Sequence, residues 1–216
     1  MVCYEGVIFD VDGTLLDSMY IWENVAAEYL KSRGATPQPG LNDDLAALGG
    51  HEIPDYFRVE YGLRETANTI QRGINKLLED YYFYNAPLKA GVLTVLGALN
   101  ELGVKMCVAT ATDRRLIEPA LLRCGILDFF GRIFTCGEES TSKRHPDIYL
   151  RAAEYLGTHI AETLVVEDAL YAIKSAKGAG FPVAAVYDIT AEDKQEEIKS
   201  ICDHYYVSMV EMLNDL

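Results

Sequence analysis

Residues 6–14 read GVIFDVDGT. Residues 6–9 predict a short buried strand, and Asp10 and Asp12 follow that strand at once. Because side chains alternate along an extended segment, both carboxylates are expected on the same side of the chain. Two acids held so close repel each other unless a cation lies between them or one of them is protonated. We therefore interpret this segment as part of a functional site rather than as an ordinary Asp-Gly turn.

Short apolar runs recur along the rest of the chain and predict further buried strands. They lie at residues 104–109, 132–135, 163–166, 183–186 and 205–207. Segments with helical spacing separate several of them, at residues 90–102, 114–123 and 146–156. Alternating strands and helices are typical of a parallel sheet with helices on both faces. We predict an α/β fold whose core is a Rossmann-like, doubly wound parallel sheet.

The region after the first strand departs from this alternation. No second strand pattern appears before residue 104, and four helical segments come first, at residues 18–33, 43–48, 54–61 and 65–84. A crossover of that length is far beyond the usual connection. We predict an inserted all-helical cap over residues 16–87, with the core formed by residues 1–15 and 88–216. Ligands of open α/β sheets bind at the carboxyl edge, where such an insertion can act as a lid.

The composition limits the classes of partner. The net charge is −14, which argues against binding to nucleic acid or to an anionic membrane surface but leaves a small phosphorylated substrate open. The cysteines are scattered without a CxxC pair, at positions 3, 107, 124, 136 and 202, which favours a reducing compartment. No apolar run approaches the ~20 residues of a membrane span. We expect a cytoplasmic protein, monomeric by default.

Polar residues follow several of the predicted strands. Thr110 follows residues 104–109, Lys143 lies between a strand and a helix, and Glu167 and Asp168 end the strand at 163–166. Taken singly, these are ordinary helix caps or an exposed lysine. The carboxyl ends of parallel strands meet at one edge, so we expect the acids to converge with Asp10. Hard carboxylate oxygens suit Mg²⁺, and a hydroxyl beside helix amides can hold a phosphate oxygen.

In order and context, these residues resemble the motifs of the haloacid dehalogenase-like hydrolase superfamily. The resemblance covers nearly the whole chain, and the helical insertion is similar to the first cap class of that superfamily. The first motif is the most specific of the four. The matching positions are Asp10-x-Asp12-Gly13-Thr14, then Thr110, then Lys143-x-x-Pro146-Asp147, and then Glu167-Asp168.

The resemblance implies a mechanism and a cofactor. Asp10 would be the nucleophile that forms an aspartyl-phosphate, and Asp12 the general acid and base. Mg²⁺ would be held by Asp10, Glu167 and Asp168 together with the carbonyl of Asp12. The phosphate and substrate contacts would come from both parts of the chain, at Gly13, Thr14, Thr110, Ala111 and Lys143 in the core and at Gly50 and His51 in the cap.

The chain departs from the family pattern in the third and fourth motifs. Arg144 stands where the family usually has a proline, so we expect a trans peptide bond after Lys143. Ala169 replaces the usual serine after Glu167-Asp168, which removes a hydroxyl near the metal but leaves the ligands intact.

Three readings of the activity stay open. The first is a phosphatase acting on a sugar phosphate or similar phosphomonoester, and the second is a β-phosphoglucomutase-like mutase. Thr14 stands where the mutases often carry valine, and residues 48–54 contain no lysine or arginine to hold a second phosphate. We therefore favour the phosphatase. The third reading is a non-catalytic phosphate-binding module or receiver-like domain.

Overall fold

The computed structural model describes residues 4–46, 48–49 and 51–215. The chain divides into two compact units. The first unit contains Met1–Ser18 and Ala86–Leu216, and the second contains Met19–Asn85.

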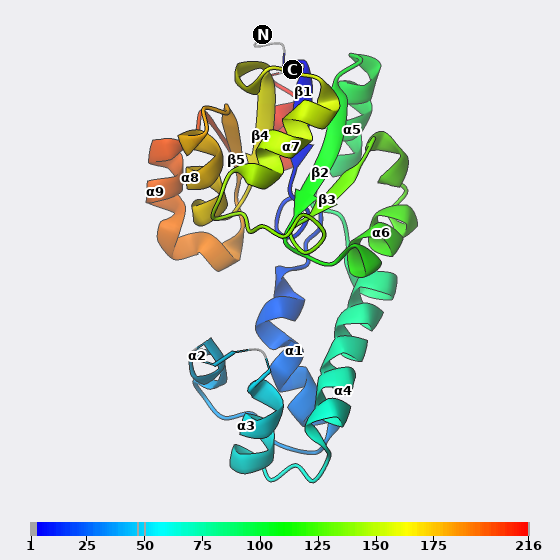
Figure 1. Cartoon of the computed structure of the whole chain (residues 1–216), viewed down its shortest axis with the longest axis vertical. Helices are drawn as coiled ribbons and strands as arrows, with labels where there is room; N and C mark the ends of the chain where they lie inside the picture. The colour runs from blue at the N-terminus through cyan, green and yellow to red at the C-terminus, as the bar shows by residue number, and fades with distance from the viewer. Residues whose placement is uncertain (1–3, 47, 50, 216) are drawn as a thin grey trace. The chain divides into compact units, whose positions relative to one another are not determined.

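A parallel β-sheet forms the centre of the first unit (Figure 1). Within the described residues it has six strands, in the order β3-β2-β1-β4-β5-β6. All four residues of β1 are buried, as the continuous apolar sequence of a central parallel strand requires. The bounds are Gly6–Phe9 for β1, Lys105–Thr110 for β2, Ile133–Thr135 for β3, Thr163–Glu167 for β4, Val183–Val186 for β5 and His204–Tyr206 for β6. The predicted strands and the predicted fold class are confirmed.

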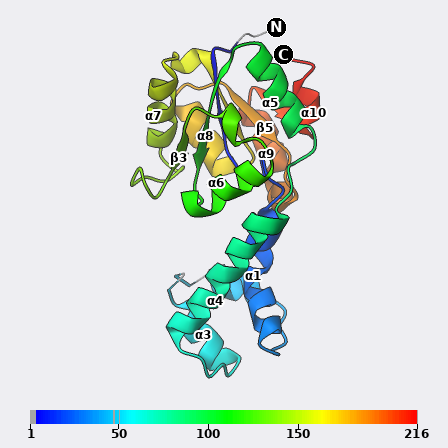
Figure 2. The same ribbon diagram turned by 90° about the vertical axis from the view of Figure 1, so that its right-hand side faces the viewer.

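Helices cover both faces of this sheet. Figure 2 shows α7 on one side of the sheet and α5 and α10 on the other. Ile8, Cys107 and Val165 belong to the core cluster that also contains buried residues of α7 and α8. The bounds are Val92–Glu101 for α5, Arg114–Arg123 for α6, Asp147–Leu156 for α7, Leu170–Gly178 for α8, Gln195–Ile201 for α9 and Met209–Met212 for α10.

In the first unit, two of the predicted helices differ from the structure at their first residues, and three of the described helices are not predicted. Helix α5 begins at Val92 rather than at residue 90 because Gly91, at φ 88°, is its left-handed N-cap. Pro146 is the N-cap of α7 rather than its first residue. The sequence patterns do not predict α8, α9 or α10. Short 3-10 turns complete the unit at Leu127–Phe129, Ile160–Glu162 and Ile189–Lys194.

The second unit is helical throughout its regular structure. Its helices are α1 (Met19–Ser32), α2 (Leu41–Ala46), α3 (Ile53–Glu60) and α4 (Ala67–Asp80), and α4 continues into a π-helical turn over Tyr81–Asn85. Each of the four predicted helical segments overlaps a helix of the structure. Helix α2 begins two residues before the predicted segment at 43–48, and residue 47 of that segment lies outside the described residues.

An aromatic stack lies at the core of the second unit. Tyr29 stacks on Phe57 with 6.2 Å between ring centroids and 10° between ring planes. Gly73 lies against the same tyrosine, since a Cβ there would come within 2.3 Å of Tyr29 Cε2. The glycine in the middle of α4 therefore allows this helix to approach Tyr29 closely. Among the described residues, no helix is long and apolar enough to cross a membrane.

A buried ion pair ties three distant segments of the first unit together. Lys89 Nζ donates to the carbonyls of Gly13 at 2.6 Å and Tyr187 at 2.7 Å, and to Asp188 Oδ2 at 2.9 Å. Asp188 Oδ1 also accepts from the amide and hydroxyl of Thr190. Burial raises the pKa of Asp188, but the hydrogen bonds from Lys89 and Thr190 outweigh it, so the pKa lies below its usual value. The segment after β1 is thus anchored to the start of α5 and to the end of β5.

Replacing Asp188 with asparagine should destabilise the first unit in a pH-dependent way. Because its pKa is lowered in the folded state, Asp188 contributes stability above its ordinary pKa of about 3.9 and loses that contribution as the pH falls further. We expect Asp188→Asn to lower the free energy of unfolding by about 2 kcal/mol at pH 7, and by less below pH 4. Urea unfolding at both pH values measures the difference.

The control for this experiment is Asp193→Asn. The side chain of Asp193 is 75% exposed, so its replacement should leave the free energy of unfolding nearly unchanged at either pH. An Asp188→Asn deficit that is equally large at pH 7 and at pH 3.5 would contradict the proposed linkage.

Candidate active site

Three described carboxylates converge where β1 and β4 end. Phe9 pairs with Val166 across these neighbouring strands, and the Asp10 amide donates to the Val166 carbonyl at 3.0 Å. This register puts Asp10 beside Glu167 and Asp168. One oxygen from each of the three lies within 4.8 Å of the others, and all three side chains are buried. The predicted convergence of the acids at one edge of the sheet is what the structure contains.

Lys143 lies among these acids. Its Nζ forms ion pairs with Asp10 Oδ1 and with Glu167 Oε1, the second at 2.6 Å, and the residue is 3% exposed. Lys143 comes from the loop between β3 and α7, which has no regular structure there. The described residues contain no cis peptide bond, so the bond before Arg144 is trans, as expected without a proline. The Arg144 guanidinium instead lies over the ring of Tyr171, 5.1 Å from its centroid.

The charges in this cluster do not balance. Burial, and next the charge of Glu167, raise the pKa of Asp10 to about 6, although Lys143 opposes the rise. Burial and the charges of Asp10 and Glu167 raise the pKa of Asp168 well above its ordinary value. Burial alone would lower the pKa of Lys143, but its two acidic partners raise it, so the ammonium stays charged. When all four groups are ionised, the three carboxylates and the one ammonium therefore leave an excess of two negative charges.

The residues fit a hard divalent cation. Glu167 is fully buried, and its Oε2 has no hydrogen-bond partner among the described residues. A buried carboxylate oxygen without a partner is costly, whereas a cation in contact with it would satisfy it. Mg²⁺ takes oxygen ligands and is commonly bound through a few carboxylates while it keeps several waters.

Asp12 has different partners from Asp10. Its Oδ1 accepts from the Ser18 hydroxyl at 2.5 Å, and its Oδ2 accepts from the Thr112 hydroxyl at 2.7 Å. Its carboxylate is not one of the three that cluster as possible ligands. Neither Ser18 nor Thr112 is among the site residues predicted from the sequence. The position of Thr112, two residues after the predicted site residue Thr110, is the feature of the sequence that could have indicated it.

Gly13 and Thr14 both contact Asp168. Gly13 has a φ of 81°, and a Cβ there would lie 2.4 Å from Asp168 Oδ2, so only glycine fits. The buried Thr14 hydroxyl donates to Asp168 Oδ1 at 3.2 Å. Thr110 is buried at the end of β2, and its hydroxyl accepts from the Thr112 amide at 3.1 Å. Ala111 follows it and is exposed.

The two predicted substrate contacts of the insertion belong to the second unit. His51 is exposed in a turn before α3. Gly50 lies outside the described residues, so its predicted role is not addressed by the structure.

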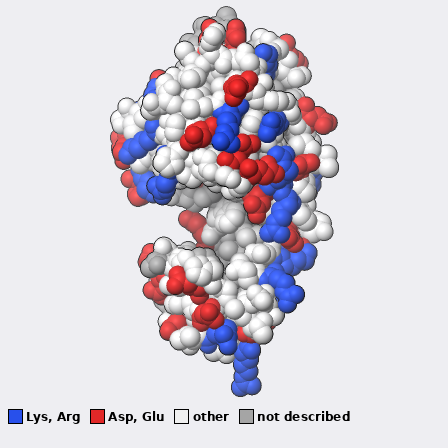
Figure 3. Space-filling model, in the orientation of Figure 1, with Lys and Arg blue, Asp and Glu red and all other residues white. Residues whose placement is uncertain are grey.

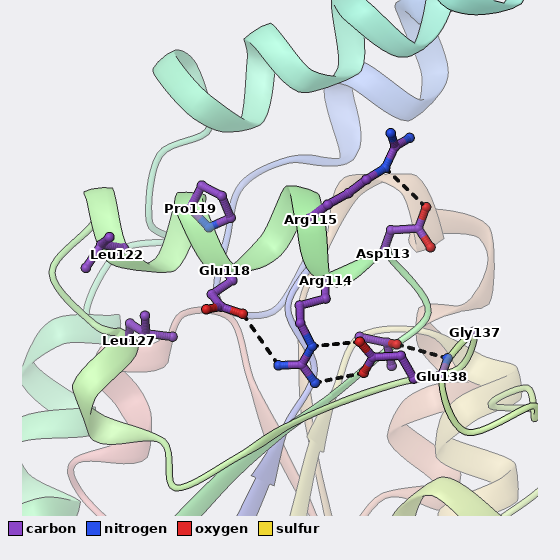
Figure 4. A pocket seen from close by; sticks show the side chains of 10 residues that line it. Asp113, Arg114, Arg115, Glu118, Pro119, Leu122, Leu127, Gly137 and Glu138 are labelled. Carbon is purple, nitrogen blue, oxygen red and sulfur yellow. Dashed lines mark hydrogen bonds and ion pairs between the residues drawn. The ribbon is translucent and has the colours of Figure 1, made fainter.

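An open hollow of about 760 Å³ lies beside α6 (Figure 4). Its charged lining residues pair with one another: Arg114 binds Glu138 at 2.7 Å and Glu118 at 3.5 Å. None of its described lining residues is one of the three clustered acids or Lys143. We therefore place the candidate active site at the acids and not in this hollow, because the unbalanced charge is at the acids.

The chain is similar to proteins described as hydrolases and phosphatases. Over residues 4–180, the chain matches the family model described as haloacid dehalogenase-like hydrolase. It is 25% identical to "Putative phosphatase YhcW" of Bacillus subtilis, over 97% of this chain and 98% of that protein. It is 28% identical to phosphoglycolate phosphatase of Agrobacterium fabrum, over 83% of this chain and 78% of the other.

A solved structure shares the fold over nearly all of the chain. It is described as a "putative beta-phosphoglucomutase" from Thermotoga maritima, and it matches with a TM-score of 0.85 at 21% identity, over 98% of this chain and 97% of that one. The family match covers most of the sequence and includes the strands that carry the clustered acids. This chain therefore belongs to the haloacid dehalogenase-like hydrolases.

Proposed function

We propose that this hydrolase is a Mg²⁺-dependent phosphatase that cleaves a small phosphorylated metabolite, such as a sugar phosphate, through an aspartyl-phosphate on Asp10. The observation that carries the proposal is the buried cluster of Asp10, Glu167 and Asp168 around Lys143. The phosphatases among the relatives support the same reaction class.

In the proposed first step, a carboxylate oxygen of Asp10 attacks phosphorus. The bond between phosphorus and the ester oxygen breaks, and Asp12 gives its proton to the leaving oxygen. Asp12 then takes a proton from water, whose oxygen attacks the same phosphorus and releases phosphate from Asp10. The hydroxyls of Ser18 and Thr112 would hold the Asp12 carboxyl in one orientation during both transfers.

The remaining groups of the core would bind the phosphoryl group and the cation. Asp10, Glu167, Asp168 and the Asp12 carbonyl would hold Mg²⁺, which supplies positive charge beside the phosphoryl oxygens. Lys143 has three N–H donors, two of which face acids, so one can reach the phosphoryl group.

Backbone and hydroxyl groups near the ends of β1 and β2 would complete the phosphate site. Thr110 accepts a backbone hydrogen bond and can donate its own hydroxyl hydrogen to phosphate. Gly13 and Ala111 would add backbone contacts. Thr14 is proposed near the phosphate as well, although its hydroxyl donates to Asp168 in this structure.

We propose that the second unit, which interrupts the core sequence between β1 and β2, is a cap that selects the substrate. Gly50 and His51 would contribute contacts to the substrate from that cap. The core would then determine the reaction, and the cap would determine which phosphomonoester is cleaved.

The proposed setting is a monomer in the cytoplasm that binds neither nucleic acid nor membrane. The described cysteines are free thiols, as a reducing compartment requires. The net charge is −14, and Figure 3 shows acidic and basic side chains interspersed on the face that it presents. A surface of this kind does not attract polyanions.

Asp10→Asn should abolish turnover while the protein stays folded, because an amide cannot act as the nucleophile. Phosphate release from p-nitrophenyl phosphate should fall at least about a thousandfold. Circular dichroism should show an intact fold, and the exposed-site variant Asp193→Asn should retain wild-type activity. Full activity in Asp10→Asn would overturn the nucleophile assignment.

Removal of divalent cations should stop the reaction. We expect EDTA to eliminate phosphate release and added Mg²⁺ to restore it, because the buried acids would otherwise repel the phosphoryl group. Addition of Mg²⁺ should also raise the melting temperature, since the cation binds only the folded protein. Turnover that persists in EDTA would count against the proposed metal site.

A mutase uses the same core and is distinguished by its acceptor. A phosphatase transfers the phosphoryl group to water, whereas a mutase transfers it to a second sugar hydroxyl. With β-glucose 1-phosphate as substrate, phosphorus NMR should show inorganic phosphate as the first product. Glucose 6-phosphate that forms faster than phosphate would favour the mutase.

A further inference from the structure

We propose that Tyr149 is a positioning residue of the metal site: its hydroxyl holds Oε1 of Glu167 and so leaves Oε2 of that carboxylate for the cation. This inference rests on the proposed Mg²⁺ site. It assigns a role in metal affinity to a tyrosine of α7, outside the acids themselves.

The ring of Tyr149 is fixed by packing. Tyr149 lies in the first turn of α7, is 1% exposed and belongs to the core cluster between the sheet and α7. Its ring meets that of Phe181 edge to face, with 6.3 Å between centroids and 62° between planes. A ring packed on all sides cannot turn away without loss of these contacts, so its hydroxyl is held in one place.

The hydroxyl points at Glu167. Tyr149 Oη donates to Glu167 Oε1 at 2.7 Å, and Lys143 Nζ donates to the same oxygen at 2.6 Å. A phenol is protonated at neutral pH and can only donate to a carboxylate. The second oxygen, Oε2, is buried and has no partner among the described residues. Both donors on one oxygen therefore orient the carboxylate and leave its other oxygen for a cation.

The two donors, Lys143 and Tyr149, have different partners during the proposed reaction. Lys143 is shared between Asp10, Glu167 and, by our proposal, the phosphoryl group. Its position will respond when the Asp10 carboxylate loses its charge on forming the aspartyl-phosphate. Tyr149 has one hydroxyl hydrogen, which it gives to Glu167, so this bond can persist while Lys143 follows the phosphoryl group. Hydrogen bonds to the ligands of a metal typically change its affinity by 10- to 100-fold.

Tyr149→Phe tests this role because it keeps the ring and removes only the hydroxyl. We expect the Kd of Mg²⁺, measured by isothermal titration calorimetry without substrate, to rise about tenfold. The Mg²⁺ concentration for half-maximal activity should rise by a similar factor, and kcat should return toward the wild-type value at saturating Mg²⁺. A tyrosine that serves only to fill the core would change the melting temperature in EDTA and leave the Kd unchanged.

Tyr155→Phe is the matched control. Tyr155 lies on the same helix and its hydroxyl donates to the Gly131 carbonyl at 2.8 Å, away from the acids. The variant loses a phenol hydrogen bond from α7 and should bind Mg²⁺ with the wild-type Kd.

A double-mutant cycle provides a second readout. In a Glu167→Gln background, adding Tyr149→Phe should change the Mg²⁺ affinity far less than it does in the wild type, because the carboxylate that the hydroxyl orients is gone.

The possible outcomes separate this inference from the proposed function. A wild-type enzyme that depends on Mg²⁺, together with an unchanged Kd in Tyr149→Phe, would overturn the role of Tyr149 and leave the phosphatase proposal standing. A wild-type enzyme that cleaves phosphate esters without binding Mg²⁺ would overturn the metal site and this inference with it.

Discussion

The excess of buried negative charge at the ends of β1 and β4 is the constraint on which the site depends. Three carboxylates of the described chain share a space from which water is largely excluded, and the ammonium of Lys143 balances one of them. Burial, and next the repulsion between these like charges, raises the pKa of Asp10 and Asp168. Such a cluster is stabilised when it binds a cation. The excess of buried negative charge that destabilises the site is therefore also what would bind the cation of the proposed reaction.

The surroundings of the acids hold them in place despite this repulsion. Gly13 allows the backbone to lie against Asp168, where any side chain would collide with the carboxylate. Lys89 binds the carbonyl of that glycine and connects it to the buried Asp188, which follows β5. The fold thus fixes the first motif from two directions, through its contact with Asp168 and through the Lys89 ion pair.

The acids of the site could be predicted from the sequence, but the side chains that contact them could not. Asp10, Glu167 and Asp168 each follow an apolar run, and parallel strands end at a common edge, so the convergence follows from the pattern. Lys143 comes from a loop between a strand and a helix, and the pattern does not predict which acids it contacts. Tyr149 reads as one more apolar position on a helix, because periodicity reports that a side chain is buried but does not report what its hydroxyl touches. The short helices α9 and α10 also carry too few residues for a clear period.

The sequence by itself determined the alternation of strands and helices, the helical insertion, the family and the acids at the strand ends. These properties can be predicted locally, because the periodicity of apolar residues and the residues that follow a strand are both visible within short stretches of sequence. Only the tertiary structure decided that Lys143 bridges Asp10 and Glu167, that Ser18 and Thr112 hold Asp12, and that Tyr149 holds Glu167. Apart from the local bond between Ser18 and Asp12, each of these contacts joins residues from separate segments. Their distances depend on strand order, register and packing, which no single stretch of sequence specifies.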